Sequence, residues 1–409
     1  MIRNWLKNIG PGPLIAAAFI GPGTVTVCTL AGVGFGFSLL WAMVLSIVAT
    51  IVLQEMAARL GIITQKGLSE VIRTEINNPF IRTIVVILIL SAIVIGNAAY
   101  EAGNISGAIL GMESFITNPY IDIGNNSVNY LSILIGIIAF GLLFIGNYKV
   151  IEKSLIGLVT LMSLAFVITA ILTKPNLAEI IKGAFTPNFS SNNLITIIAL
   201  IGTTVVPYNL FLHAALVKEK WSKNDLGIAR KDTYVAIVLG GLVSMAIIIS
   251  AAAIQSLEIE NAAGLAKGLE PLFGSFAKYF IGIGLFAAGI TSAITAPLAA
   301  AYVVKGCLGW DTTLKSTRFR MVWIVILFTG VIFSSLGFKP IDIIKFAQVA
   351  NGLLLPIMAG LLIWIMNKET ILGKHKNNLV NNILGCIIFG ITLMLSIATL
   401  NKIFDLNLF

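Results

Sequence analysis

Charged side chains are scarce in this chain. They make up 11% of its 409 residues, whereas hydrophobic residues account for 57%. Soluble proteins carry about 25% charged residues, so this composition excludes a soluble globular protein and indicates an integral membrane protein. The net charge of +9 does not indicate nucleic-acid binding, because the basic residues lie in short loops between apolar spans.

Cysteine is also scarce. Cys28, Cys307 and Cys386 lie in or beside apolar spans without paired spacing, which argues against a disulfide framework or a metal cluster. The sequence has no nucleophile–base pair and no phosphate-binding loop, so we do not expect an enzyme. No small-residue cleavage site precedes the first apolar span, and residues 1–7 are expected to form a cytoplasmic tail.

Long apolar runs account for almost all of the chain and predict eleven membrane-spanning helices. These helices are expected at 12–36, 38–60, 81–110, 129–147, 154–173, 193–218, 233–256, 272–304, 320–336, 341–366 and 379–400. With the N-terminus inside, 20 of the 27 Lys and Arg residues fall on the inner side. This bias predicts a multi-pass protein of the cell inner (plasma) membrane with a cytoplasmic N-terminus.

Two of these runs are interrupted near mid-membrane, by Gly21-Pro22-Gly23-Thr24 in the first span and by Gly202-Thr203-Thr204 and Pro207-Tyr208-Asn209 in the sixth. Proline removes an amide donor and glycine adds backbone freedom. Lipid cannot satisfy the freed backbone groups, so such breaks typically line a substrate site. We expect 21–24 and 203–207 to be non-helical and to face one another. The simpler alternative is a proline kink closed by a neighbouring Ser or Thr.

The breaks lie five spans apart, which is typical of an inverted repeat. The segments GFGFSLLWAMVLSIVATIVLQEMAARLGIITQKGLSE, VPYNLFLHAALV and AQVANGLLLP are similar to second-, sixth- and tenth-span motifs of the Nramp family of proton-coupled divalent metal transporters. The resemblance covers nearly the whole chain. It implies an all-α integral membrane protein with the LeuT-type fold: eleven transmembrane helices, a 5+5 inverted repeat, and broken first and sixth helices. Residues 1–409 would form one transporter domain, with repeats at about 12–173 and 193–366 and an extra helix at about 379–400.

The chain departs from the family pattern at the metal-binding positions. In the family's first-span Asp-Pro-Gly-Asn motif, the two ligand positions correspond to Gly21 and Thr24 here. The metal-binding methionine of the sixth span becomes Val206 and the following histidine becomes Tyr208. A divalent cation at mid-membrane needs oxygen ligands and normally a carboxylate, and a thioether favours soft metals. The sequence therefore argues against manganese or iron, and less strongly against magnesium, which retains its waters.

These observations give a set of candidate substrate-binding residues, of which the last rests on the resemblance to the tenth-span glutamine motif: Gly21, Pro22, Gly23, Thr24, Thr203, Thr204, Val206, Tyr208, Asn209 and Gln348. Half-helix N-termini and hydroxyl donors suit an anion, so the expected substrate is a small anion, with bicarbonate as the specific prediction. A magnesium or manganese transporter is the alternative. An uncharged polar substrate, a dead site and a non-transporting membrane sensor also remain open.

Ionisable residues within spans are functional candidates by default. Glu55 and Arg59 are four apart on the second span and are expected to form a mainly structural ion pair. Glu101 matches the acid of the family's third-span motif, although Ala98 replaces the motif's aspartate and a two-carboxylate proton path is in doubt. His213 matches a family histidine and is interpreted as either a proton carrier or a packing residue.

Three hydroxyls of the eighth span, Thr291, Ser292 and Thr295, resemble the sodium site of several LeuT-type transporters. Simple packing between membrane helices is the alternative. Beyond a coupling ion, either sodium or a proton, no cofactor is expected. The expected partners are the lipid bilayer and a small inorganic ion but no nucleic acid, and a monomer is the default expectation for oligomeric state.

Overall fold

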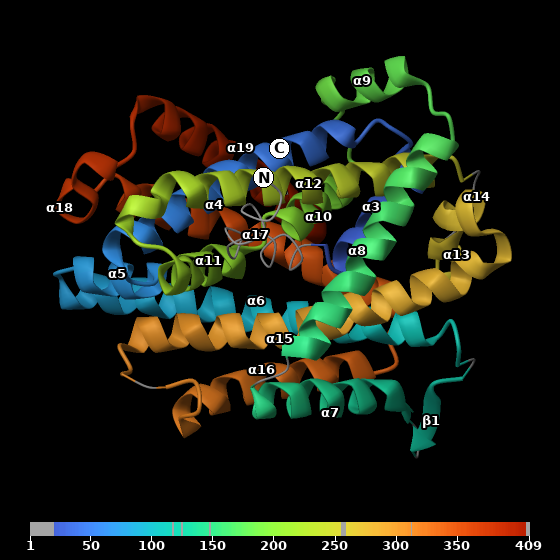
Figure 1. The fold of residues 1–409 in the computed structure, drawn as a ribbon, viewed down its shortest axis with the longest axis horizontal. Coiled ribbons are helices and arrows are strands. Elements are labelled where there is room, and N and C mark those ends of the chain that lie inside the picture. The colour runs from blue at the N-terminus through green and yellow to red at the C-terminus, as the bar shows by residue number, and fades with distance from the viewer. Residues whose placement is uncertain are drawn as a thin grey trace.

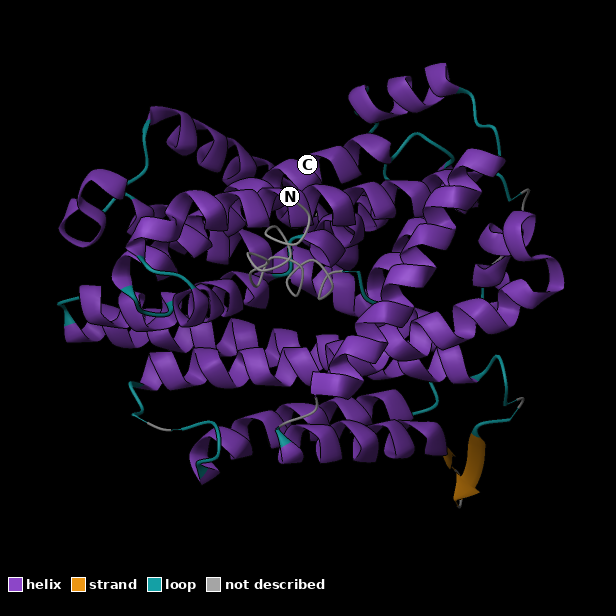
Figure 2. Ribbon diagram, viewed as in Figure 1, coloured by secondary structure: helices purple, strands orange, loops and turns teal. Residues whose placement is uncertain are grey.

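The protein is almost entirely helical in the computed structural model, which describes residues 20–116, 118–123, 126–146, 149–254, 259–311 and 313–405. A short hairpin of β1 (Tyr120–Ile123) and β2 (Asn126–Asn129) contains the only strands in the described residues (Figure 2). In Figure 1 the long helices run across the view. The ends that carry α5 and α18 lie on one side, and α13, α14 and β1 lie on the other.

Eleven apolar spans account for the core, as the sequence predicts. The first four are α3 (Pro22–Phe35), α4 (Leu40–Thr64), α6 (Pro79–Met112) and α7 (Tyr130–Ile145). The next four are α8 (Lys149–Leu172), the pair α10 (Leu194–Thr204) and α11 (Pro207–Lys220), α12 (Leu226–Ala252) and α15 (Ala277–Leu308). The last three are α16 (Thr317–Ser335), α17 (Pro340–Met366) and α19 (Leu379–Phe404). Within the described residues, nine are long and apolar enough to cross a membrane, while α3 and α7 are shorter apolar helices.

Short elements that hydropathy does not predict connect these spans: α5 (Leu68–Glu75), α9 (Leu177–Phe185), α13 (Ala262–Ala266), α14 (Glu270–Phe273) and α18 (Glu369–Leu372). They are too short or too polar to produce a hydropathy signal. Helix α9, for example, has caps at both ends and packs on α4 and on the turn before it, where a Cβ added to Gly183 would lie 2.1 Å from the carbonyl oxygen of Phe37.

Helix α6 lies at the centre of the packing, against α15, α17 and α16 (Figure 1). Its glycines permit close approach at three crossings. A Cβ on Gly103 would lie 2.9 Å from the Ala347 side chain, one on Gly107 would lie 2.1 Å from Pro22, and one on Gly111 would lie 2.5 Å from the Gly282 carbonyl oxygen. Small residues serve this purpose between membrane helices because they bring the backbones together.

The two helix breaks are present but shorter than predicted. Gly21 has an extended backbone and Pro22 already begins α3, so 22–24 are helical rather than irregular. In the sixth span only Val205 and Val206 separate α10 from α11, and Thr203 and Thr204 belong to the last turn of α10. Proline is well tolerated at the first position of a helix, where its missing N–H costs no hydrogen bond. Both prolines therefore start a half-helix. The predicted part of the first span at 12–19 lies outside the described residues.

Candidate functional site

The two breaks meet in the interior of the protein. The Thr24 hydroxyl, on the first turn of α3, lies 2.8 Å from the Thr203 hydroxyl on the last turn of α10. Both side chains are buried. A span-one residue thus contacts a span-six residue 179 positions away in sequence, which confirms that the breaks face one another.

Gln348 of α17 packs against both half-helices beside this contact. A Cβ on Gly23 would lie 2.2 Å from Gln348 Nε2, and one on Gly202 would lie 2.0 Å from the Gln348 carbonyl oxygen. The two glycines therefore allow α17 to pack directly against both half-helices. Gln348 is 2% exposed, and its side-chain oxygen has no hydrogen-bond partner among the described residues.

The α10–α11 break presents oxygen atoms. Pro207 has no N–H to donate to the carbonyl of Thr203, four residues earlier, so that carbonyl lacks its usual helical partner. Asn209 is fully buried, and in the described part of the chain neither atom of its amide has a hydrogen-bond partner. Buried polar groups are normally satisfied, so such groups indicate a site for water or an ion. Val206 caps α11 with an apolar side chain that offers no ligand.

Two predicted substrate residues face elsewhere. The Thr204 hydroxyl donates to the Leu200 carbonyl at 3.1 Å and lies 3.6 Å from Met43 Sδ, so it does not join the Thr24–Thr203 contact. The Tyr208 ring packs edge-on against Tyr100 of α6, with centroids 5.4 Å apart. Both residues are buried beside the break rather than at its centre.

The predicted coupling residues of α6 and α11 lie away from this centre. Glu101 is fully buried between α6 and α16, where a Cβ on Gly330 would lie 2.5 Å from its Cγ, and it accepts a hydrogen bond from Asn104 at 3.3 Å. His213 Nδ1 lies 2.8 Å from Gln54 Oε1 of α4. Each acid or imidazole is therefore held by an amide side chain.

The three hydroxyls of the eighth span differ in their hydrogen bonding. Thr291 donates to the Ala287 carbonyl at 2.7 Å and Thr295 donates to the Thr291 carbonyl at 2.9 Å, both within α15. The Ser292 hydroxyl is buried and has no partner among the residues that the structure describes. A hydroxyl oxygen that donates in this way still has lone pairs for a cation.

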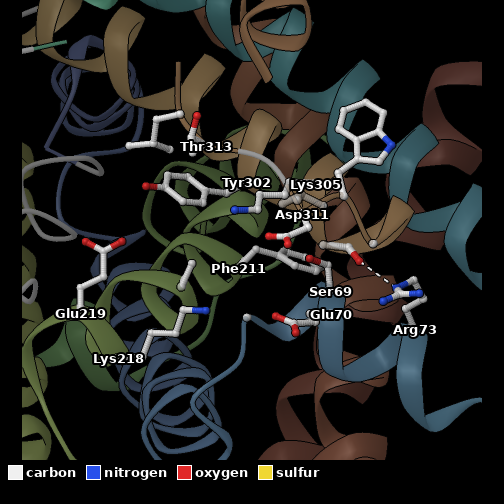
Figure 3. Close-up of a pocket in the computed structure, with 17 residues that line it drawn as sticks. Ser69, Glu70, Arg73, Phe211, Lys218, Glu219, Tyr302, Lys305, Asp311 and Thr313 are labelled. Atoms are coloured by element: carbon white, nitrogen blue, oxygen red, sulfur yellow. Dashed lines mark hydrogen bonds between the residues drawn. The ribbon is translucent and has the colours of Figure 1, made fainter. Parts of the chain in front are cut away.

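A cavity of about 970 Å³ opens at the end of the molecule that carries α5 (Figure 3). Its lining includes Phe211 of α11, one turn beyond the break. Charges of both signs surround it, from Arg73, Lys218, Lys305, Glu70, Glu219 and Asp311. Arg73 Nε donates to the Gly306 carbonyl at 3.2 Å, which ties α5 to α15. The cavity thus brings solvent-accessible charge close to the second half of the broken sixth span.

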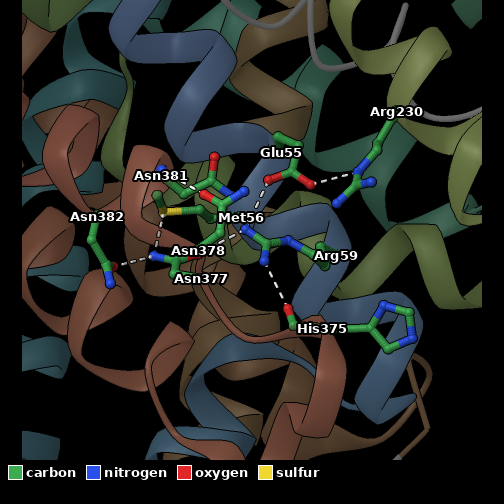
Figure 4. A network of polar contacts seen from close by, with 9 residues as sticks. All are labelled: Glu55, Met56, Arg59, Arg230, His375, Asn377, Asn378, Asn381 and Asn382. Atoms are coloured by element: carbon green, nitrogen blue, oxygen red, sulfur yellow. Dashed lines mark hydrogen bonds and ion pairs between the residues drawn. The ribbon is translucent and has the colours of Figure 1, made fainter.

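A charge network lies on α4 towards the same end (Figure 4). Glu55 pairs with Arg59 at 3.0 Å, as predicted from their spacing, and with Arg230 of α12 at 2.7 Å. Arg59 also donates to the His375 carbonyl at 2.7 Å and to Asn377 Oδ1 at 2.8 Å. The network therefore connects α4, α12 and the segment before α19.

Sequence reasoning missed the amides and the aromatic ring that hold the predicted residues. Gln54 stands beside His213, Asn104 beside Glu101, and Tyr100 beside Tyr208. Each had a sequence signal, because a polar side chain within an apolar span must find a partner in the protein. Which partner it finds depends on helix packing, which a single sequence does not specify.

The whole chain is similar to known transporters. The family model described as natural resistance-associated macrophage protein-like matches residues 12–402. A divalent metal cation transporter MntH of Yersinia pestis is 29% identical, over 97% of this chain and 96% of the relative. MntH of Caldanaerobacter subterraneus is 24% identical, over 97% of this chain and 93% of the relative.

Solved structures agree on the fold. The manganese transporter of Eremococcus coleocola superposes with a TM-score of 0.78 at 20% identity, covering 98% of this chain and 87% of that protein. Mhp1, a nucleobase-cation-symport-1 family transporter, gives a TM-score of 0.55 at 15% identity, over 97% of this chain and 94% of that protein. These likenesses confirm the predicted LeuT-type fold.

The relatives contradict the predicted substrate. Both MntH proteins carry the name of divalent metal cation transporters, and none of the comparisons supports bicarbonate or another anion. The half-helices offer a physical reason. Each begins with proline, Pro22 or Pro207, which removes one of the N–H donors of that N-terminus and so weakens the case for an anion.

A family match that extends from residue 12 to residue 402, together with full-length relatives and the shared fold, establishes that the chain belongs to the Nramp family.

Proposed function

We propose that this protein is a membrane transporter of divalent cations, with hydrated Mg²⁺ as its specific substrate. The observation that carries the proposal is the set of neutral oxygen atoms at the break, whose own residues supply no thioether and no carboxylate. The break offers the Thr24 and Thr203 hydroxyls, the Thr203 carbonyl and the Asn209 and Gln348 amides. Oxygen ligands suit hard cations. The C-terminal end of α10 also carries partial negative charge, which favours a cation.

The choice of Mg²⁺ over Mn²⁺ follows from what the break does not contain. Val206 gives no thioether and Gly21 gives no carboxylate, so a transition metal finds no side-chain ligand that would favour it over magnesium. Mg²⁺ gives up its water shell reluctantly and is bound through few protein groups. Neutral oxygen atoms can hydrogen-bond to waters that the ion retains.

Uptake into proteoliposomes tests the proposal, with a Mg²⁺-sensitive dye inside and purified protein in the membrane. Saturable Mg²⁺ entry is expected, at weak affinity. Thr203→Val should reduce the initial rate about tenfold, the equivalent of losing one hydrogen bond to a charged species. Thr204→Val is the matched control, because its hydroxyl is already bonded within α10 and to Met43.

Three outcomes would contradict this function. Equal loss of uptake in the Thr203→Val and Thr204→Val variants would show that the Thr203 hydroxyl has no specific role in transport. Saturable Mn²⁺ uptake that excess Mg²⁺ does not inhibit would identify a transition metal, and not Mg²⁺, as the substrate. An absence of any divalent cation uptake under sodium, proton or voltage gradients would favour the non-transporting sensor instead.

Sodium is the coupling ion that we propose, with a proton on Glu101 or His213 as the alternative. The support is the buried Ser292 hydroxyl, which has no partner among the described residues. Uptake should then need a sodium gradient and should fall with Ser292→Ala. Ser335→Ala is the control, since its exposed hydroxyl donates to Ile332 within α16. Uptake of equal size in sodium-free buffer, driven by pH alone, would assign coupling to the proton.

The protein is further proposed to act as a monomer in the cell inner (plasma) membrane with its N-terminus in the cytoplasm. The positive-inside bias of the sequence supports this orientation. In that orientation the cavity beside α5, with its acidic and basic side chains, opens to the cytoplasm.

A further inference from the structure

An apolar groove runs between α6, α16 and α17 on the membrane-facing side of the molecule. It has a volume of about 890 Å³. Its floor is made of small residues, among them Gly96, Ala98 and Ala102 of α6. Phe333 and Phe346, both more than half exposed, stand along its walls. Ala98, where the family motif has an aspartate, is therefore part of a surface with almost no polar group.

The only two polar side chains in the lining are Thr329 and Asp342. The Thr329 hydroxyl donates to the Ile326 carbonyl of its own helix at 2.8 Å, so it does not require a partner in the groove. Asp342 lies in the first turn of α17, at the end of the groove near the α16–α17 turn, and is exposed. No ion pair to Asp342 is found in the part of the chain that the structure describes.

The length of the groove matches one leaflet of a bilayer. Its lining on α17 extends from Asp342 to Leu354. This run covers about 18 Å at the usual rise of an α-helix. The hydrocarbon core of a bilayer is about 30 Å thick, so one leaflet contributes about 15 Å. With Asp342 at one membrane surface, a groove of this length would extend to mid-depth.

We propose that this groove binds one acyl chain of a zwitterionic membrane lipid, whose headgroup ammonium pairs with Asp342. The chain fits because the floor has no charge and the walls are apolar over a leaflet's depth. The headgroup class follows from charge: the one ionised group in the lining is negative and stands at the membrane surface. A bound chain would also cover the seam where Glu101 packs against Gly330, and so keep water from that carboxyl group.

Photolabelling tests this proposal independently of the transport activity. The full chain is reconstituted in vesicles of phosphatidylethanolamine and phosphatidylglycerol with the same acyl chains. One of the two lipids carries a diazirine near the end of its chain, and the labelled peptides are identified by mass spectrometry. We expect label on α6, α16 and α17 within the groove. We also expect about fivefold more label from the ethanolamine lipid, the equivalent of about 1 kcal/mol for one surface ion pair.

Two groups of variants test the binding of the acyl chain and the binding of the headgroup separately. Ala98→Phe and, as a second test on the opposite wall, Ala350→Leu should each remove most of the groove label. Gly141→Phe on α7 is the control, because a Cβ at Gly141 meets nothing within 4 Å. Asp342→Asn should leave chain labelling in place and bring the preference between the two lipids to about one, since the ion pair is lost.

The proposal is overturned if the label is spread evenly around the membrane-facing helices, or if it persists in the groove of both filled variants. Equal labelling by the two lipids in the unaltered protein would overturn the headgroup assignment. Folding of each variant is checked by gel filtration. If either Ala98→Phe or Ala350→Leu does not fold, the labelling of the other variant decides the test.

Discussion

The α10–α11 break and the α4 network are both polar and largely buried, but they are built from different groups. Among the described residues, the break has neutral hydroxyls and amides around Thr24, Thr203 and Gln348. The network has three charged side chains, Glu55, Arg59 and Arg230, joined by ion pairs of 2.7 to 3.0 Å. Fixed charges hold three segments together in the network, whereas the break keeps neutral groups that can release a substrate.

The largest effect is expected from breaking the network. Arg59→Leu removes an ion pair and two further hydrogen bonds and leaves Glu55 with one partner. Removing one member of a buried ion pair typically costs about 3–5 kcal/mol. Thermal unfolding in detergent should show a marked loss of stability. Unchanged stability in this variant would mean that the charges of the network do not hold its three segments together.

The next effect concerns the break. Gly23→Ala would place a Cβ 2.2 Å from Gln348 Nε2, so the glutamine side chain must move out of the site. We expect Mg²⁺ uptake to fall while stability changes by about 1 kcal/mol, as for many single substitutions. Gly34→Ala in the same helix is the control, because its Cβ meets nothing within 4 Å. Equal uptake in the two variants would remove Gln348 from the substrate site.

Glu113, a partly buried acid outside both regions, is expected to have an intermediate effect. Burial raises the pKa of Glu113, just beyond the end of α6, from 4.5 to about 7. The folded protein therefore binds this proton more tightly than the unfolded chain does. Stability should fall as pH rises from about 4.5 to about 7, by about 1 kcal/mol once solvent screening is included. Glu113→Gln should reduce this pH dependence of stability in thermal unfolding scans. An unchanged pH dependence would mean that other groups cause it.

The smallest effect is expected from the exposed pair of Lys376 and Glu369, 2.5 Å apart. Both side chains are largely in solvent, where ion pairs contribute little. Lys376→Ala should leave thermal unfolding unchanged, although Lys376 lies next to Asn377 of the network. A loss comparable to that of Arg59→Leu would show that the segment before α19, and not the buried charge, holds α4 in place.

The spans were predictable because apolar length is a direct property of sequence. Helix α17 was expected at 341–366 and observed at Pro340–Met366. The breaks were found from Pro22 and Pro207, but their extent was overestimated, because a proline at the first position of a helix is compatible with the turns on either side. The Glu55–Arg59 pair followed from helical spacing, whereas its contacts to Arg230 and Asn377 depend on long-range packing.

The substrate was harder to predict than the fold. Gly21 and Val206 offer neither a carboxylate nor a thioether, but the inference from this to an anion was wrong and gave too much weight to helix N-termini. The free main-chain carbonyl of Thr203 was missed because it follows from Pro207 four positions later and not from the side chain of Thr203 itself. Cation ligands of this kind are visible only once the helix boundaries are known.

The glycine crossings of α6 also affect how closely its neighbours can pack. At Gly103, Gly107 and Gly111 the neighbouring segments rest on bare backbone rather than between interlocked side chains. At these three positions α17, α3 and α15 meet α6 with no α6 side chain between the backbones. Helix α6 thus sets the spacing of three neighbouring segments, and a larger side chain at any of these glycines would have to displace the segment that contacts it.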